Sequence, residues 1–344
     1  MQASRQLGLW SRYSKKWAGA IAVLVLTGIA VVLFFHKIPI HAIEDAWGRL
    51  SAPVLLWALG CQIAFVELRA IRFASMAGPL DSTAKDLSAR PYQWFGPTAA
   101  YSMTCSVFPG GIGELLLPVY LRPYGVASSA SLGLAVGGRL FDVGWSVVLA
   151  FVFSLWIIPH QGWTTVRLSL VVGAVAMILI IMAIRLIDGG RIMAVLERRK
   201  VPHWARRGIA AGFRAQTVLK RLSWRDMAVL SLMTIGMKLS STLFYEVIAH
   251  GLGYSVGFFH IGAAMMFFSL FMVFPLQGVA GFGTTEAWWI LALTLVGLPL
   301  KGAIVMALTF HVLNLLYVSA LGGVYMLARL RPVSWMVRRN AKVK

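Results

Sequence analysis

The sequence predicts an all-α polytopic integral membrane protein, built as an inverted-topology repeat with about six full spans and two re-entrant or broken hairpins. The first observation is composition. The 344 residues are 59% hydrophobic and only 13% charged, with a mean hydropathy of +0.76, which is too apolar for a soluble fold. The second is that long apolar stretches recur along the chain. The third is a pair of glycine-rich motifs that look like copies of one another.

The first repeat is predicted at residues 18–158. The segment before it, 1–17, carries four basic residues and no acid. We therefore expect this N-terminal segment to be cytoplasmic. Within the repeat we expect a helix, a second helix, a hairpin and a third helix, at 18–35, 53–74, 92–122 and 128–158. The return arm of the hairpin is too short to cross a membrane alone, since a crossing needs about 20 residues.

The second repeat is predicted at residues 159–327 and has the same order of elements. Its helices are expected at 166–187, 227–250 and 301–327, and its hairpin at 258–297. The loop 188–226 holds ten basic residues against three acids, and the tail 328–344 is basic without any acid. Basic loops lie on the cytoplasmic side of a membrane, so both segments are expected there.

These cytoplasmic segments determine the direction of each hairpin. The first two helices bring the chain back to the cytoplasm, and the pair at 128–158 and 166–187 must also end there. The hairpin at 92–122 therefore enters from the cytoplasm, and the hairpin at 258–297 enters from outside. The second half thus repeats the first upside down, an architecture common among secondary transporters.

The first motif is Phe108-Pro-Gly-Gly-Ile-Gly-Glu114, and the second is Pro275-Leu-Gln-Gly-Val-Ala-Gly-Phe-Gly-Thr-Thr-Glu286. Their glutamates are 172 residues apart, as are Gly125 and Gly297. Glycine and proline break a helix, and hydrocarbon tolerates the exposed backbone only where protein buries it or a wet cavity adjoins it. One such motif would be an ordinary turn, but two matching copies favour a transport site. The glycines assigned to this site are Gly110, Gly111, Gly113, Gly281 and Gly283.

Charged residues inside a membrane are usually paired or functional, because a central charge costs at least about 2.5–3.5 kcal/mol. Five acids lie in or near apolar segments: Glu67, Glu114, Asp142, Glu246 and Glu286. Arg139 and Asp142 are three residues apart and can pair on one helix face; otherwise Arg139 can hold a phosphate. Arg69 and Arg72 are expected to extend to the inner interface.

Two further cations are candidates for substrate contact. Lys238 is expected in the middle of a helix, where it needs an anion: Glu246, Glu286 or a substrate phosphate. Arg122 follows the first motif and can hold a phosphate in place of Arg139. The short helices that follow the glycine turns would add backbone N–H donors for the same anion.

The roles of Glu114 and Glu286 stay open between proton carriers, contacts to an amine, and caps of their own short helices. His311 and Asn314, one turn apart, are interpreted as interhelical hydrogen-bonding residues. No metal-ligand spacing, P-loop or nucleotide motif is present, so no metal or cofactor is expected. Cysteines occur at positions 61 and 105 in apolar runs and are interpreted as small core residues. The net charge of +20 lies in loops and tails, so nucleic acid is not an expected partner.

At these residues the sequence resembles a known family. The run from Pro109 through Glu114, then Gly125-Val126, then Gly138-Arg139-Leu-Phe-Asp142, and later the second motif, are similar to the lysylphosphatidylglycerol synthase transmembrane region, or flippase-like domain family. The resemblance spans about residues 15–330. It implies a protein of the inner or cytoplasmic membrane of a bacterium or archaeon that moves a lipid between leaflets.

We therefore expect a lipid translocase that moves an anionic or modified phospholipid or a lipid-linked headgroup, and not an enzyme. Both termini are expected to be cytoplasmic. The alternatives are a polyprenyl-phosphate transporter similar to the DedA group, and a membrane enzyme or scaffold of lipid or envelope synthesis. The sequence leaves open the lipid, the direction of transport, coupling to protons and assembly into a homo-oligomer.

Overall fold

The computed structural model describes residues 40–78, 92–157, 222–273 and 278–340, with single positions 168, 171 and 175. This part of the chain forms helices and contains no strand. The predicted helix 18–35, nearly all of helix 166–187 and most of loop 188–226 lie outside the described residues. The elements are α2 (Ile40–Trp47), α3 (Ala52–Ala77), α5 (Tyr92–Val107), η1 (Pro109–Leu116), α6 (Leu117–Leu121), η2 (Arg122–Tyr124), α7 (Ser128–Ser154), α11 (Trp224–Gly251), α12 (Phe258–Phe271), η3 (Val279–Gly281), α13 (Thr284–Leu295) and α14 (Leu300–Asn340).

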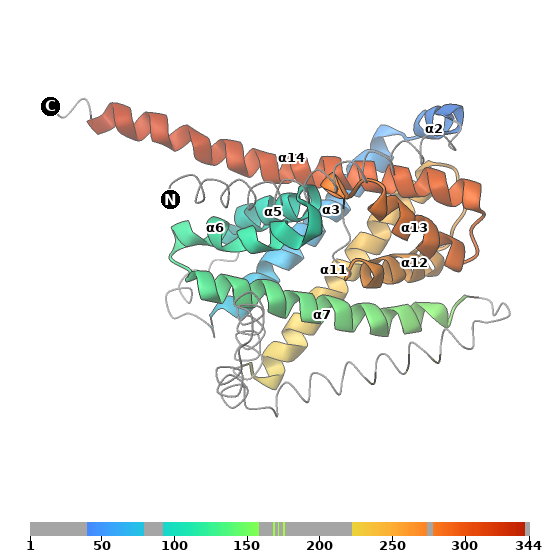
Figure 1. The fold of residues 1–344 in the computed structure, drawn as a ribbon, viewed down its shortest axis with the longest axis horizontal. Coiled ribbons are helices and arrows are strands. Elements are labelled where there is room, and N and C mark those ends of the chain that lie inside the picture. The colour runs from blue at the N-terminus through green and yellow to red at the C-terminus, as the bar shows by residue number, and fades with distance from the viewer. Residues whose placement is uncertain are drawn as a thin grey trace, which may run out of the picture.

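Four described helices are long and apolar enough to cross a membrane: α3, α7, α11 and the Leu300–Arg329 part of α14. They confirm the helices predicted at 53–74, 128–158, 227–250 and 301–327. The all-α membrane class is therefore confirmed. α14 runs on to Asn340, so the described part of the basic tail continues the last span as a helix. α14 and α7 run along opposite edges of the molecule, and the two hairpins lie between them (Figure 1).

Helix starts follow local chemistry. α11 begins at a capping box, in which the Ser223 side chain accepts from the Asp226 N–H and the Asp226 carboxylate accepts from the Ser223 N–H. This reciprocal pair satisfies backbone donors that the first turn of a helix leaves free. The two short return arms end at Gly125 and Gly297, whose φ angles are +80° and +93°. Glycine adopts this left-handed backbone at little cost, which explains both glycines.

Both hairpins are built from helices too short to cross a membrane. The entering arms α5 and α12 have 16 and 14 residues, and the return arms α6 and α13 have 5 and 12. A crossing helix needs about 20 residues. These lengths favour the re-entrant form of each hairpin. The two glycine motifs meet, since η1 contacts η3.

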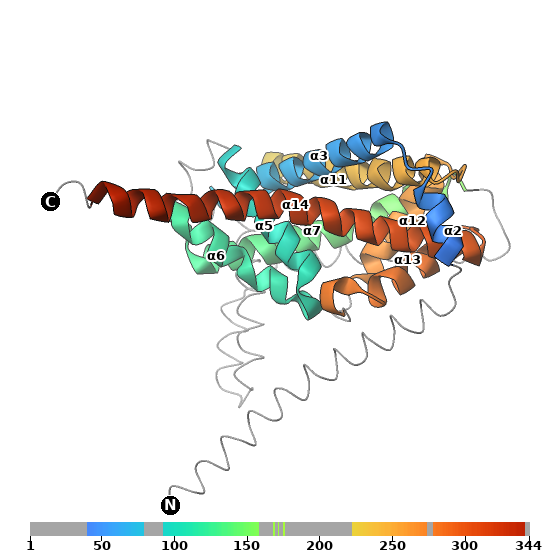
Figure 2. The same cartoon turned by 90° about the horizontal axis from the view of Figure 1, so that it is seen from above.

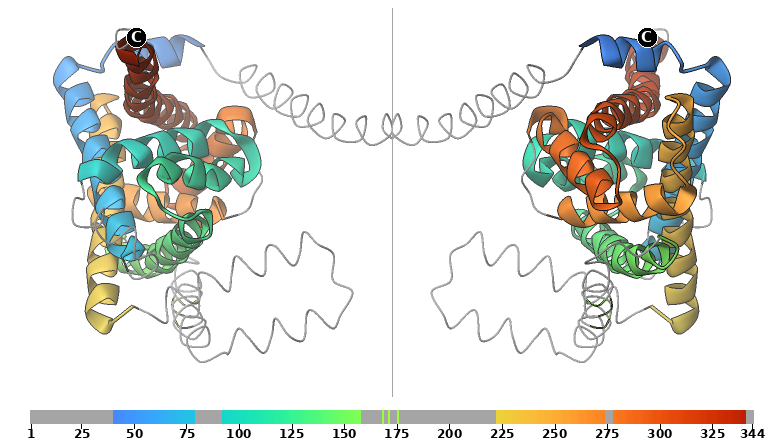
Figure 3. Two further views of the ribbon diagram at one scale, coloured as in Figure 1. Left: turned by 90° about the vertical axis from the view of Figure 1, so that its left-hand side faces the viewer. Right: turned by 90° about the vertical axis from the view of Figure 1, so that its right-hand side faces the viewer.

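Contacts between the elements come in matched sets. α3 packs along α11, and the two helices form one flank of the molecule (Figures 2 and 3). α5 packs on α14, and α12 packs on α7 in the same way. Likewise α6 contacts α7, and α13 contacts α14. A two-fold relation between the halves requires this pattern. The inverted repeat itself remains a prediction, because one helix of each half lies outside the described residues.

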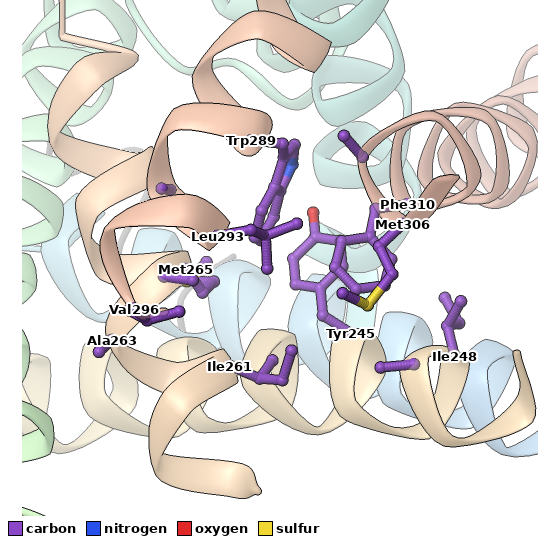
Figure 4. Close-up of a cluster of buried hydrophobic side chains, with 14 of the residues drawn as sticks. Tyr245, Ile248, Ile261, Ala263, Met265, Trp289, Leu293, Val296, Met306 and Phe310 are labelled. Atoms are coloured by element: carbon purple, nitrogen blue, oxygen red, sulfur yellow. The ribbon is translucent and has the colours of Figure 1, made fainter. Parts of the chain in front are cut away.

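Two apolar clusters form the core, and each contains residues of both halves. In the second half, Tyr245 of α11, Trp289 of α13 and Phe310 of α14 pack together, with ring centroids 4.4–5.1 Å apart (Figure 4). Aromatic pairs at this spacing contribute about 0.5–1.5 kcal/mol beyond their buried area. The first half buries Phe73 and Tyr101 in a second cluster.

Candidate functional site

A cavity of about 240 Å³ lies where the two halves meet. Residues from α3, α5, η1, α7, α11, α12, η3, α13 and α14 line it. It therefore involves both hairpins and every described spanning helix. The ionisable side chains of its lining are Arg69, Cys105, Glu114, Arg139, Asp142, Lys238, Tyr245 and His311.

Arg72 and Asp142 form a buried ion pair beside the cavity. Nη1 of Arg72 donates to Oδ1 of Asp142 at 2.5 Å, and Nη2 donates to Oδ2 at 3.2 Å. Nη1 also donates to Oγ1 of Thr234. The arginine side chain is 0% exposed. The prediction that Arg72 extends to the membrane interface is therefore wrong. Asp142 on α7 accepts hydrogen bonds through both carboxylate oxygens, and this bidentate pair compensates the positive charge of Arg72 inside the protein.

Arg139 binds the first motif instead of Asp142. Its Nη2 lies 2.6 Å from Oε1 of Glu114. The predicted pairing of Arg139 with Asp142 on one helix face is therefore wrong. Asp142 faces α3, where the Arg72 guanidinium contacts both of its carboxylate oxygens. Arg139, three residues before Asp142 on the same helix, makes no such contact and binds Glu114. The Glu114 and Arg139 side chains stay 29% and 44% exposed.

Arg69 is a cavity residue that the sequence reasoning missed. Its Nη1 donates to Oγ of Ser102 at 3.1 Å, and its guanidinium lies 4.8 Å from the centre of the Tyr101 ring. Its Nε is buried without a hydrogen-bond partner. The signal that could have found it is spacing: residues three apart share a helix face, so an inward Arg72 brings Arg69 inward with it.

Lys238 lines the same cavity from α11 and is 7% exposed. Its Nζ donates to Oγ of Ser269 at 3.3 Å. The expected carboxylate partners are engaged elsewhere, Glu246 with His250 at 3.8 Å and Glu286 with His311 at 2.6 Å. Across the described ranges, neither Lys238 nor Arg69 has a carboxylate oxygen within 4.0 Å. Among the described residues, the hydrogen-bond partner of each cation is thus a serine hydroxyl, and Arg69 also contacts aromatic rings.

Glu286 is buried and caps its own helix, one of the three roles considered for it. Its Oε2 accepts from the Gly283 N–H at 2.7 Å, and its Oε1 lies 2.6 Å from Nδ1 of His311. Nε2 of His311 lies 2.8 Å from the carbonyl oxygen of Ala280. His311 therefore ties the second hairpin to α14. The expectation of an interhelical hydrogen bond from His311 is confirmed, and its partner places it in the candidate site.

Comparison with known protein families finds a match over most of the chain. Residues 18–322 match the lysylphosphatidylglycerol synthase TM region. The chain belongs to this family. It is thus a membrane protein of a family linked to lipid or envelope processes. No curated protein and no solved structure matches the chain.

The glycines predicted for the site differ in whether they line the cavity. Gly281 lines the cavity, and with Ala280 and Gly283 it has a left-handed backbone, at φ angles of +75°, +51° and +81°. Gly113 packs instead on the α5 backbone, where an added Cβ would lie 2.6 Å from Cα of Cys105. Gly110 and Gly111 lie in η1.

Arg122 is exposed at the start of η2 and does not line the cavity. The structure therefore does not bring it to the cations of the candidate site. The cysteines are free, and the described residues hold no cluster of three potential metal ligands.

The spacing of 172 residues relates more positions than the glutamates. Arg139 and His311 are also 172 apart, as are Asp142 and Asn314. All four line the cavity. The repeat spacing is thus a signal in the sequence that points to His311 and Asn314 as counterparts of the arginine and aspartate.

Proposed function

We propose that this protein is a flippase-like lipid translocase, which carries an anionic headgroup through the central cavity while the lipid tails stay in the bilayer. The main support for the proposal is the surroundings of Arg69 and Lys238 in the described part of the chain. Both line the cavity, and each has a serine hydroxyl as partner instead of a carboxylate. Family membership supports the same class of function.

The charges beside the cavity do not cancel. Arg72 is paired with Asp142, and Arg139 is paired with Glu114. This leaves the positive charges of Arg69 and Lys238. Removing an unpaired charge from water costs several kcal/mol. An anion that enters the cavity would pair with Arg69 and Lys238 and offset part of this cost.

A phosphate group fits this site in chemistry and in size. A guanidinium presents a planar fork of donors that matches phosphate oxygens, and an ammonium adds a compact charge. A cavity of about 240 Å³ has room for a headgroup phosphate.

The hairpins suggest how the headgroup passes. η1 and η3 meet at the cavity, and the sequence predicts that they enter from opposite sides. Rocking one half against the other would open the cavity to one leaflet at a time. Family membership supports a location in the inner or cytoplasmic membrane. The distribution of basic residues supports cytoplasmic termini.

Leaflet exchange in proteoliposomes tests the proposal. The lipid panel holds labelled phosphatidylglycerol, phosphatidylcholine and a polyprenyl phosphate. We expect exchange of a phosphate-bearing anionic lipid and little exchange of phosphatidylcholine. Arg69→Gln and Lys238→Gln each lower the rate about tenfold or more, the effect of losing a charged hydrogen bond of roughly 1.5–3 kcal/mol.

Arg122→Gln is the matched control, because it removes an exposed arginine outside the cavity. Its exchange rate should equal that of the wild type. Exchange of phosphatidylcholine as fast as anionic lipid, or full activity in both cavity variants, would contradict the proposal. Chemical conversion of a lipid without exchange would favour the membrane-enzyme alternative.

A further inference from the structure

The pair formed by Glu286 and His311 has a feature that the translocase proposal does not use. The two side chains are 1% and 6% exposed and 2.6 Å apart. Glu286 belongs to α13 and His311 to α14, and His311 lines the cavity. A titratable pair is thus buried at the edge of the proposed headgroup site.

The hydrogen bonds of the pair define where its protons lie. A carbonyl oxygen can only accept, so Nε2 of His311 must carry the hydrogen that it donates to Ala280. The other contact joins Oε1 of Glu286 to Nδ1. It is a hydrogen bond only when one more proton lies between these atoms. The pair is then either a carboxylate with an imidazolium or a carboxylic acid with a neutral imidazole, and it is neutral overall in both forms.

Loss of that proton breaks a contact. If His311 keeps its hydrogen on Nε2, a lone pair of Nδ1 faces the Glu286 carboxylate. If the hydrogen moves to Nδ1, a lone pair of Nε2 faces the Ala280 carbonyl. The first state breaks the contact between α13 and α14, and the second breaks the contact between η3 and α14. Ala280 has a φ angle of +51°, a left-handed backbone that is unfavourable for a residue with a side chain, so its contact with His311 helps to hold the shape of η3.

We propose that the Glu286–His311 pair is a proton site that couples proton movement to headgroup movement; this inference rests on the proposed translocase. The proton enters from cavity water and settles between Oε1 and Nδ1. It leaves to cavity water when the second hairpin separates from α14. No other bond is made or broken.

The surrounding charges give the sign of the coupling. The titratable groups that line this cavity together with His311 are Arg69 of α3, Cys105 of α5, Glu114 of η1, Arg139 and Asp142 of α7, and Lys238 and Tyr245 of α11. Among the described residues, α12 contributes none to this cavity. With Arg72 included, positive charges around the empty cavity exceed negative ones by two. A bound anion cancels that excess, so the anion and the proton favour each other's binding, and they move in the same direction.

Calorimetry on the full chain in detergent micelles tests this linkage. The probe is phosphatidylglycerol with six-carbon chains, titrated in two buffers with different heats of protonation, over a series of pH values. At a pH where the Glu286–His311 pair of the anion-free protein has lost its shared proton, the wild type should take up about one proton for each anion that binds. This follows from the reciprocity of linked binding. Its affinity for the anion should fall as the pH rises.

Glu286→Gln is the decisive variant. A glutamine amide can donate to Nδ1 of His311 and accept from Gly283, so it copies the protonated pair without a removable proton. We expect this variant to bind and exchange the anionic lipid without taking up a proton. An imposed proton gradient should accelerate exchange by the wild type several-fold and have no effect on the variant.

Glu246→Gln is the matched control. It removes the glutamate of a second Glu–His pair, which lies outside the cavity with its atoms 3.8 Å apart, and its proton uptake should equal that of the wild type. Anion binding by the wild type without proton uptake at any pH would overturn the inference and leave the translocase standing. Full uptake by Glu286→Gln would overturn it too. Neither binding nor exchange of any lipid would overturn the proposed function, and the inference with it.

Discussion

The two glycine motifs share one construction and differ in chemistry. In each, the glutamate contacts a residue 25 positions later, on the last spanning helix of its half: Arg139 for Glu114 and His311 for Glu286. The first pair joins a glutamate to an arginine and is partly exposed, whereas the second joins a glutamate to a histidine and is buried. Two similar motifs thus place different partners for a glutamate beside one cavity, and the proposed proton site belongs to the second motif alone.

Asp142 and Asn314, which lie one helical turn after Arg139 and His311, also differ in charge. Asp142 compensates the buried Arg72, while its counterpart Asn314 carries no charge and lies at the cavity wall. Asp142→Ala should lower the free energy of unfolding by about 3–5 kcal/mol, because it leaves a buried charge unpaired. Asn314→Ala should lower it by less than about 1 kcal/mol. Unfolding of the detergent-solubilised protein measures both; equal losses would contradict the assigned roles.

The glycines of the two motifs should also respond differently to a methyl group. Gly113→Ala would push Cβ against the α5 backbone, so we expect a loss of about 1–3 kcal/mol in stability from overpacking. Gly281→Ala would strain a residue with φ of +75°, at about 1–2 kcal/mol, and would meet only a side chain, Thr285, within 3 Å. Thermal unfolding should therefore rank Gly113→Ala as the more damaging. The reverse order would contradict the packing of η1 on α5.

The smallest effect is expected when the first pair is made to resemble the second. Arg139→His keeps a partner for Glu114 at low pH and loses it as the pH rises through the ordinary pKa of histidine, about 6.5. Lipid exchange by the variant should therefore fall a few-fold between mildly acidic and alkaline pH, beyond any change in the wild type. Exchange measured over that range gives the answer. An unchanged pH profile would show that the Glu114 pair plays no part in transport.

The sequence predicted the class, four described spans and both hairpins, because apolar length and glycine punctuation are local properties. It could not predict which way Arg69 and Arg72 point. Both lie near the end of a helix, where extension to the interface is the usual outcome, and only the packing of α3 against α11 and α7 brings them inward.

The partner of a side chain was likewise beyond sequence reasoning. Arg139 and Asp142 can pair by helix geometry alone, yet each has a better-placed partner on another element. The role of His311 depends on the fold of η3, which brings the Ala280 carbonyl within hydrogen-bonding distance. Its repeat spacing was visible, but spacing alone does not show a contact.

The most direct test of the account is leaflet exchange of labelled phosphatidylglycerol and phosphatidylcholine in the same proteoliposomes, with the wild type beside the double variant Arg69→Gln, Lys238→Gln. The wild type should exchange the anionic lipid selectively, and the folded double variant should lose this exchange. Equal exchange of both lipids by the wild type, or undiminished anionic exchange by the double variant, would contradict the claim that these two cations hold the headgroup.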